Sequence, residues 1–130
     1  MKLLRLEHLD IVCADVKKSV EFYRKLGLTP EGTLDNGNVV FLFSGDDESP
    51  VRVELHQAEK GQKTGVDHIA FEVADTGAAY REGKDQGLEF KFEPLQNIQS
   101  GRHIANLYDP DGVQVQFARK TLEGEYGNWG

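Results

Sequence analysis

The feature that most constrains the fold is an internal repeat, each copy of which begins with a histidine-led apolar segment. The first copy runs from His8 to Leu28 and the second from His68 to Leu88, at a constant offset of sixty residues and without a gap. Each copy reads as a strand, an Ala-Asp helix entry, a short helix and a Gly-Leu exit. An internal repeat fixes the architecture of a chain, but two copies are too few for a solenoid. The sequence therefore predicts two similar modules packed into one fold.

Turn and periodicity signals divide the rest of each copy into strands. In the first copy, Asp15 is a suitable N-cap, Gly27 ends the helix, and an Asn-Gly turn at 35–38 separates two strands. In the second copy, Asp75 caps the helix and Asp109–Gly112 forms a hairpin turn. The predicted strands are 4–13, 28–34, 39–43 and 51–56 in the first module, and 66–74, 88–92, 102–108 and 113–118 in the second, with a loop at 94–101. Each module is therefore βαβββ, and the fold class is α+β.

Length and composition are those of one soluble globular domain. The chain has 130 residues, of which 38% are hydrophobic, and this is enough to bury a core. We therefore predict a single domain over 1–120, with modules at about 3–57 and 66–118, followed by a glycine-rich tail at 121–130.

Charge and cysteine content narrow the class of function. The net charge of −7 argues against a nucleic-acid partner, which would need a basic face, and fits a protein that binds a small molecule. No apolar run approaches the length of a membrane span, so no membrane partner is expected. The single cysteine, Cys13, rules out an internal disulfide and suits a reducing compartment. The protein is therefore predicted to be cytoplasmic.

Polar residues at matched positions of the two modules form a candidate metal site. His8 and His68 lie on equivalent strands. The closing strands carry Glu54 in the first module and Gln116 in the second, so the four side chains converge if both sheets curl around a shared cleft. Such nitrogen and oxygen donors suit one divalent ion, which would be Zn, Ni, Co, Mn or Fe. Two alternatives stay open. A lone histidine at a strand start is more often structural than a ligand, and a buried Glu54 could instead pair with Arg52 on the same face.

Three stretches of the chain resemble the vicinal-oxygen-chelate superfamily, which includes glyoxalase I, methylmalonyl-CoA epimerase, extradiol dioxygenases and fosfomycin-resistance enzymes. They are the helix Ser19–Leu28 that follows His8, the segment Asp67–Phe71, and the turn Asp109–Gly112. The resemblance covers about residues 3 to 118. It implies that the paired modules form a cupped half-barrel sheet with flanking helices around one divalent metal, in a protein that is usually a homodimer.

The resemblance also assigns the metal ligands, and one of them departs from the usual residue. The matching positions are His8, Glu54, His68 and Gln116. Most relatives carry glutamate where this chain has Gln116, as a ligand and often as the catalytic base. Glutamine can ligate through its carbonyl oxygen but cannot accept a proton at neutral pH. The role of catalytic base therefore passes to Glu54. The same departure counts against an ordinary extradiol dioxygenase, which would take its carboxylate ligand from this last strand.

Arg102 and His103, which precede the second signature turn, are the candidate substrate-binding residues. The guanidinium of Arg102 could hold a substrate carboxylate, although a surface arginine at a sheet edge is an equally good interpretation. His56 shares the strand face of Glu54 and is a reserve metal ligand.

Three functions are compatible with these residues. The first is a metal-dependent, glyoxalase-I-like lyase or isomerase, close to lactoylglutathione lyase, in which Glu54 moves a proton next to a carbonyl. The second is an Fe(II) enzyme of the extradiol dioxygenase type, and the third is a non-catalytic protein that binds a small molecule such as a drug. Fold alone does not decide among them. Open sheet edges and apolar flanks predict a homodimer in each case.

Overall fold

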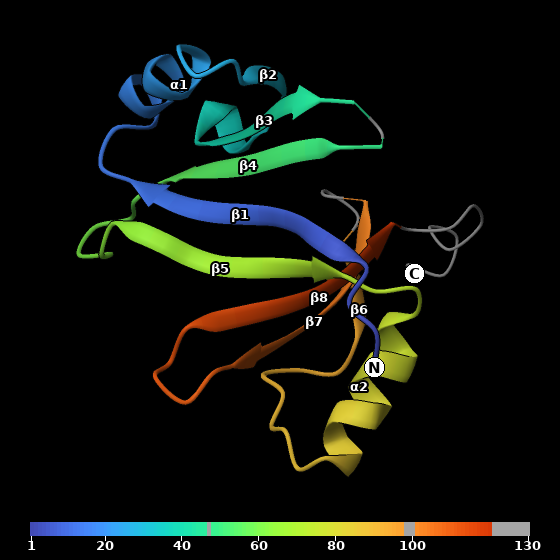
Figure 1. Cartoon of the computed structure of the whole chain (residues 1–130). Helices are drawn as coiled ribbons and strands as arrows, with labels where there is room; N and C mark the ends of the chain where they lie inside the picture. Colours follow the sequence, from blue (N-terminus) through green and yellow to red (C-terminus); the bar gives the residue numbers. More distant parts are fainter. Residues whose placement is uncertain (47, 98–100, 121–130) are drawn as a thin grey trace. The chain divides into compact units, whose positions relative to one another are not determined.

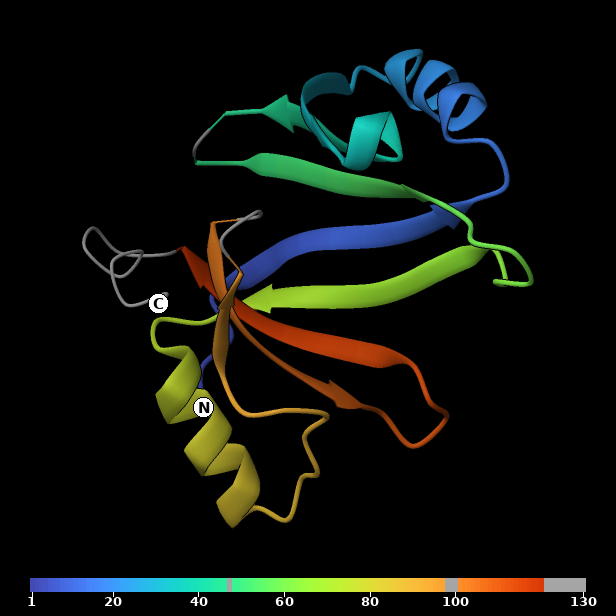
Figure 2. The ribbon, with the colours of Figure 1, turned by 180° about the vertical axis from the view of Figure 1, so that it is seen from behind.

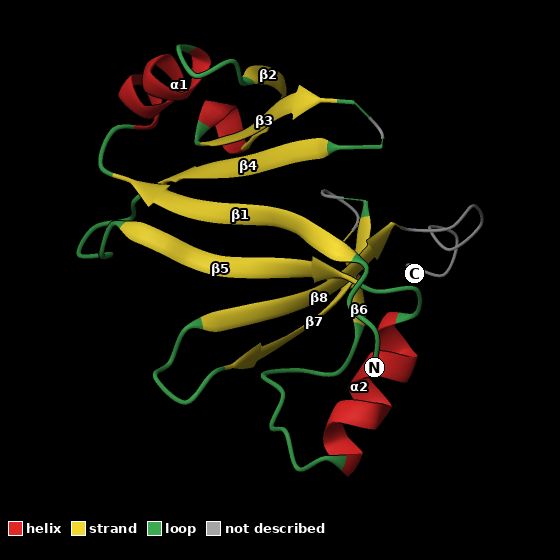
Figure 3. Cartoon of the chain, viewed as in Figure 1, coloured by secondary structure: helices red, strands yellow, loops and turns green. Residues whose placement is uncertain are grey.

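The computed structural model describes residues 1–46, 48–97 and 101–120 and contains, within them, two α-helices and eight strands (Figures 1 and 3). Each helix follows one strand and precedes three others, so the predicted α+β class and the repeated βαβββ order are confirmed. The chain divides into two compact units, Glu7–Ile69 and the rest, which are described separately below. The predicted tail at 121–130 lies outside the described residues, and the grouping of both modules into one domain stays a prediction.

The unit Glu7–Ile69 contains the first module and the start of the second. Its elements are β1 (Arg5–Cys13), which enters at Glu7, α1 (Val16–Arg24), β2 (Thr29–Leu34), the 3-10 helix η1 (Asp35–Gly37), β3 (Val39–Gly45), β4 (Pro50–Gln57) and the start of β5 (Gly65–Glu72). The strand order is β2-β3-β4-β1-β5. β1 runs parallel to β4, whereas β3 is antiparallel to both β2 and β4. The predicted turn at 35–38 is present, with η1 linking β2 to β3.

Helix α1 decides which side chains of β4 face the functional site. The Asp15 side chain caps the helix by accepting hydrogen bonds from the backbone N–H groups of Lys17 and Lys18, as predicted. The apolar face of α1 packs against a core that includes Val53 and Leu55 of β4. Because side chains alternate along a strand, burial of these residues under α1 directs Glu54 to the opposite face of the sheet.

The second unit contains the rest of the second module. Its further elements are α2 (Thr76–Asp85), β6 (Leu95–Asn97), β7 (Arg102–Tyr108) and β8 (Gln114–Lys120). β8 pairs with β7, and β7 pairs with β6, all antiparallel (Figure 2). The Asp109 carboxylate accepts hydrogen bonds from the N–H groups of Asp111 and Val113, which confirms the predicted hairpin turn. In the described part of the chain, neither helix is long and apolar enough to cross a membrane.

The predicted strand at 88–92 is wrong. The sixth strand is instead Leu95–Asn97, inside the segment predicted to be a loop. Within 88–92, Phe90 forms an isolated bridge to Leu107. Leu88, Glu89 and Phe90 alternate between apolar and polar as in a strand. The apolar positions arise because the Phe90 ring packs into the core beneath α2, not because the segment forms a ladder of backbone hydrogen bonds.

The packing of Phe90 also explains why α2 contains Gly83, although glycine has a low helix propensity. A Cβ atom at Gly83 would lie 2.9 Å from two ring carbons of Phe90, whereas at Gly77 it would meet only side-chain atoms of Arg81 and Asp75 at 3.3 Å. Both Gly→Ala changes gain the same helix propensity, about 1 kcal/mol. We expect G83A to be less stable than G77A by about 1–3 kcal/mol, the usual cost of overpacking. Urea unfolding of the two variants measures the difference, and equal stabilities would contradict the account of Gly83.

Candidate metal centre

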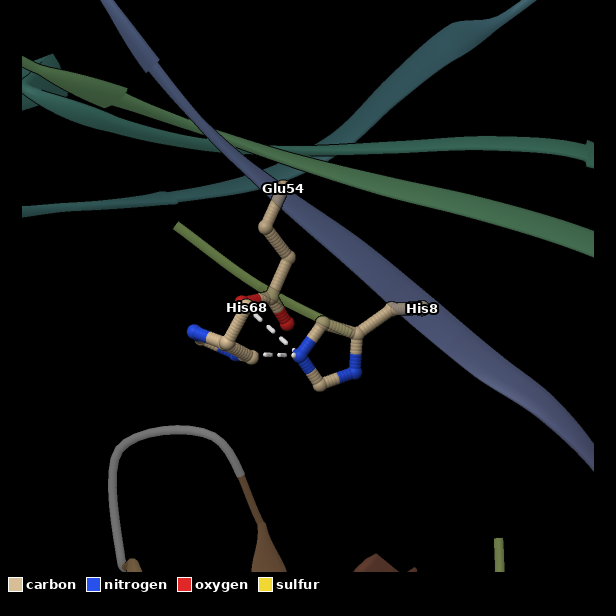
Figure 4. A group of neighbouring side chains, drawn as sticks. All are labelled: His8, Glu54 and His68. Atoms are coloured by element: carbon tan, nitrogen blue, oxygen red, sulfur yellow. Dashed lines mark hydrogen bonds and ion pairs between the residues drawn. The ribbon is translucent and has the colours of Figure 1, made fainter. Parts of the chain in front are cut away.

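The two repeat histidines and Glu54 come together within the unit Glu7–Ile69. His8 lies on β1, His68 on the neighbouring strand β5, and Glu54 on β4, on the other side of β1. The Nε2 atoms of His8 and His68 are 3.0 Å apart, and Glu54 Oε2 lies 3.6 Å from His8 Nε2 (Figure 4). His8 is 2% exposed and Glu54 7% exposed. The structure thus brings together three of the four predicted ligands in a buried place.

The other ring nitrogen of each histidine is bonded to a carboxylate. His8 Nδ1 contacts Glu7 Oε2, and His68 Nδ1 lies 2.8 Å from Asp67 Oδ2. A carboxylate only accepts hydrogen bonds, so in the neutral rings the proton lies on Nδ1 and the lone pair on Nε2. The Nε2 atoms of the two rings and the Glu54 carboxylate therefore face one another as three possible metal-ligand atoms.

This arrangement fits a divalent cation. Imidazole nitrogen together with carboxylate oxygen suits Zn, Ni, Co, Mn or Fe(II). Zinc binds histidine nitrogen and carboxylate oxygen at about 2.0–2.2 Å, so ligand atoms on one ion lie roughly 3–3.6 Å apart. The two observed separations, 3.0 and 3.6 Å, fall in this interval. His8, His68 and Glu54 would hold the ion.

Two further polar residues, Asp10 and His56, lie next to this triad. From the sequence, Asp10 is assigned no role and His56 is only a reserve metal ligand. Asp10, 2% exposed, forms an ion pair with His56, and His56 Nε2 lies 4.0 Å from Glu54 Oε2. The sequence does place them on the same strand faces as the triad, because Asp10 follows His8 by two residues and His56 follows Glu54 by two. Their pairing depends on the parallel register of β1 against β4, which aligns Asp10 with Glu54.

The protonation state of His56 makes the Asp10–His56 pair a poorer metal site than the triad. Burial raises the pKa of Asp10, and its hydrogen bond with His56 offsets part of this rise. Burial lowers the pKa of His56, but hydrogen bonds to Asp10 and Glu54 outweigh this effect and raise the pKa to about 10. His56 is therefore cationic at neutral pH. A group formed by Asp10, Glu54 and His56 is also compact enough to hold an ion, but the proton on His56 makes it the poorer site.

A pocket of about 290 Å³ adjoins the triad within the same unit and shares His68 with it. Asp10, Asp35, Glu59 and Asp67 contribute carboxylates to its lining. The pocket gives a small molecule access to His68, and its acidic lining favours uncharged or cationic groups over anionic ones.

The remaining predicted site residues belong to the other unit. Gln116 is buried at 6% exposure on β8, where it pairs with Asn106 of β7. Arg102 and His103 are consecutive residues of β7, so their side chains point to opposite faces of the strand. Arg102 shares the face of Gln116, whereas the His103 backbone carbonyl accepts a hydrogen bond from Thr76 at the start of α2. The predicted ligand role of Gln116 and the substrate roles of Arg102 and His103 stay predictions.

Comparisons with known proteins agree with the fold. Residues 5–117 match the family model of the glyoxalase/bleomycin resistance protein/dioxygenase superfamily. The Bacillus subtilis protein YwkD is 28% identical over 134 residues, covering 89% of this chain and 97% of the relative. A variant of Streptomyces coelicolor methylmalonyl-CoA epimerase in complex with 2-nitronate-propionyl-CoA superposes with a TM-score of 0.77 and 26% identity, over 93% of this chain and 100% of that one. The 2,3-dioxygenase LapB from Pseudomonas sp. KL28 shares the fold at 19% identity (TM-score 0.76), with 92% of this chain matching 42% of LapB.

Proposed function

Because the chain belongs to the glyoxalase/bleomycin resistance protein/dioxygenase superfamily, we propose that it is a metal-dependent lyase or isomerase that moves a proton next to a carbonyl group. The observation that carries this proposal is the meeting of His8, His68 and Glu54, whose ligand atoms lie close enough together to hold one metal ion, beside a pocket. The structural similarity to a methylmalonyl-CoA epimerase supports an isomerase over other chemistries.

Each residue of the triad has a distinct task in this proposal. A divalent ion held there would polarise a substrate carbonyl and so acidify the adjacent C–H bond. His8 and His68 would bind the ion through Nε2, while Glu7 and Asp67 contact the Nδ1 atoms of their rings. Glu54 is the one carboxylate of the triad and accepts the proton from carbon. His56 is cationic, and its Nε2 atom forms an ion pair with Glu54 Oε2 at 4.0 Å.

Proton exchange in D₂O tests the proposal without a known product. The metal-loaded protein should replace the hydrogen next to the carbonyl with deuterium, as followed by NMR. Candidate substrates are methylmalonyl-CoA and the hemithioacetals of methylglyoxal with glutathione or with an uncharged thiol. Because carboxylates line the pocket, we expect the uncharged hemithioacetal to react at least as well as the glutathione adduct. A metal-loaded protein that exchanges none of the three would contradict the proposal, including its narrower form of a lactoylglutathione-lyase-like activity.

The donor set favours one other enzyme class. Two histidines and one carboxylate with open positions also hold Fe(II) in oxygenases. An enzyme of this class would consume O₂ with a catechol when loaded with Fe(II), and would show no exchange in the NMR test. Metal binding without either reaction would point to a non-catalytic small-molecule-binding protein. The homodimer and the cytoplasmic location stay predictions from the sequence.

A further inference from the structure

We propose that Glu7 and Asp67 are paired positioning residues, each fixing the histidine that follows it so that Nε2 faces the ion. The inference rests on the proposed metal site, and it concerns what makes that site rigid. Each carboxylate directly precedes a repeat histidine in the sequence, and each contacts the Nδ1 atom of that histidine.

The geometry is unusual for a strand. Consecutive side chains on a strand normally point to opposite faces, so neighbours in sequence do not meet. Here both carboxylates reach the ring nitrogen of the next residue, at equivalent places sixty residues apart. The two contacts leave both Nε2 atoms directed at each other, 3.0 Å apart. A purely structural pair would not need both rings turned toward one point.

Each contact between a carboxylate and a ring Nδ1 atom has three physical effects. An N–H group bonded to a carboxylate fixes the tautomer, restrains the ring and raises the basicity of the opposite nitrogen. His8 is 2% exposed, and the Glu7 side chain is itself only 13% exposed, so this contact is screened little by water. The Asp67 side chain is 37% exposed and lines the pocket, so we expect it to contribute less than Glu7.

Zinc affinity and the histidine tautomers test the inference separately. We expect Glu7→Gln and Asp67→Asn each to weaken Zn²⁺ binding by roughly 10–100-fold, as measured by competition with a chromophoric chelator. Asp67→Glu should restore most of the affinity. Glu59→Gln is the matched control, because Glu59 also places a carboxylate in the pocket lining. It should change the affinity by less than about threefold if the effect comes from ring positioning rather than from the charge of the pocket.

Nitrogen NMR of the metal-free protein reads the tautomers independently of zinc. In the wild type, both His8 and His68 should be protonated on Nδ1, and each carboxylate variant should lose this preference at its own histidine only. Nε2-protonated rings in the wild type would overturn the inference, even if zinc binds. So would wild-type affinity in both Glu7→Gln and Asp67→Asn. If the wild-type protein bound no zinc while the Nδ1 tautomers were present, the proposed function would fail and the positioning contacts would stand.

Discussion

Replacing Glu54 with glutamine is expected to lower turnover by roughly 10²–10⁴-fold, the usual cost of losing a general base. Glu54 is the carboxylate of the triad, and it is buried at 7% exposure 3.6 Å from His8 Nε2. Glutamine has nearly the same shape and keeps a carbonyl oxygen that can ligate a metal, but it cannot accept a proton. The fold and part of the metal affinity should therefore persist while proton exchange is lost.

The measurement compares the rate of deuterium exchange in the wild type and in Glu54→Gln at saturating metal. Glu31→Gln is the control, since it makes the same chemical change at an exposed position on β2 of the same unit. It should leave the exchange rate unchanged. Near-wild-type exchange in metal-saturated Glu54→Gln would show that another group takes the proton.

Zinc is expected to stabilise the folded protein strongly, through linkage of binding to folding. A ligand that binds only the native state adds about 2.7 kcal/mol at 100 times its dissociation constant and about 4.1 kcal/mol at 1,000 times. The triad depends on residues from β1, β4 and β5, so it exists only in the folded chain. Urea unfolding with and without zinc should show this increment in the wild type and almost none in His8→Ala or His68→Ala.

His103→Ala is the control, because it removes a histidine that is not part of the triad. His103 lies on β7 in the other unit, on the opposite strand face from Gln116. Its removal should leave the zinc-dependent increment unchanged. A full increment in His8→Ala would contradict the assignment of that residue as a ligand.

Most of the fold followed from local patterns in the sequence. The repeat placed His8 and His68 on equivalent strands, and both Asp15 and Asp75 cap helices as predicted. The failure at 88–92 arose because one buried aromatic, Phe90, gives the same alternation as a strand while making only a single bridge. Whether such a segment forms a ladder depends on packing against α2 and β7, which local pattern does not contain.

The site was predictable in its residue types but not in its contacts. The alternation of β4 placed Glu54 and His56 on one face, yet the ion pair between His56 and Asp10 needs the register of β1 against β4. The bonds from Glu7 and Asp67 to the histidine rings run against the expectation that successive strand residues face apart. Arg102 and His103 were both predicted to bind substrate, but as consecutive residues of β7 they point to opposite faces of the strand.

Equilibrium dialysis of the protein against Zn²⁺ determines whether His8, His68 and Glu54 hold one divalent ion. The protein is first stripped with a chelator, and bound zinc is then counted per chain. We expect one tightly bound ion in the wild type and none at the same free zinc concentration in His8→Ala or His68→Ala. A wild-type protein that binds no ion, or variants that each still bind one as tightly, would contradict the assignment of these residues as metal ligands.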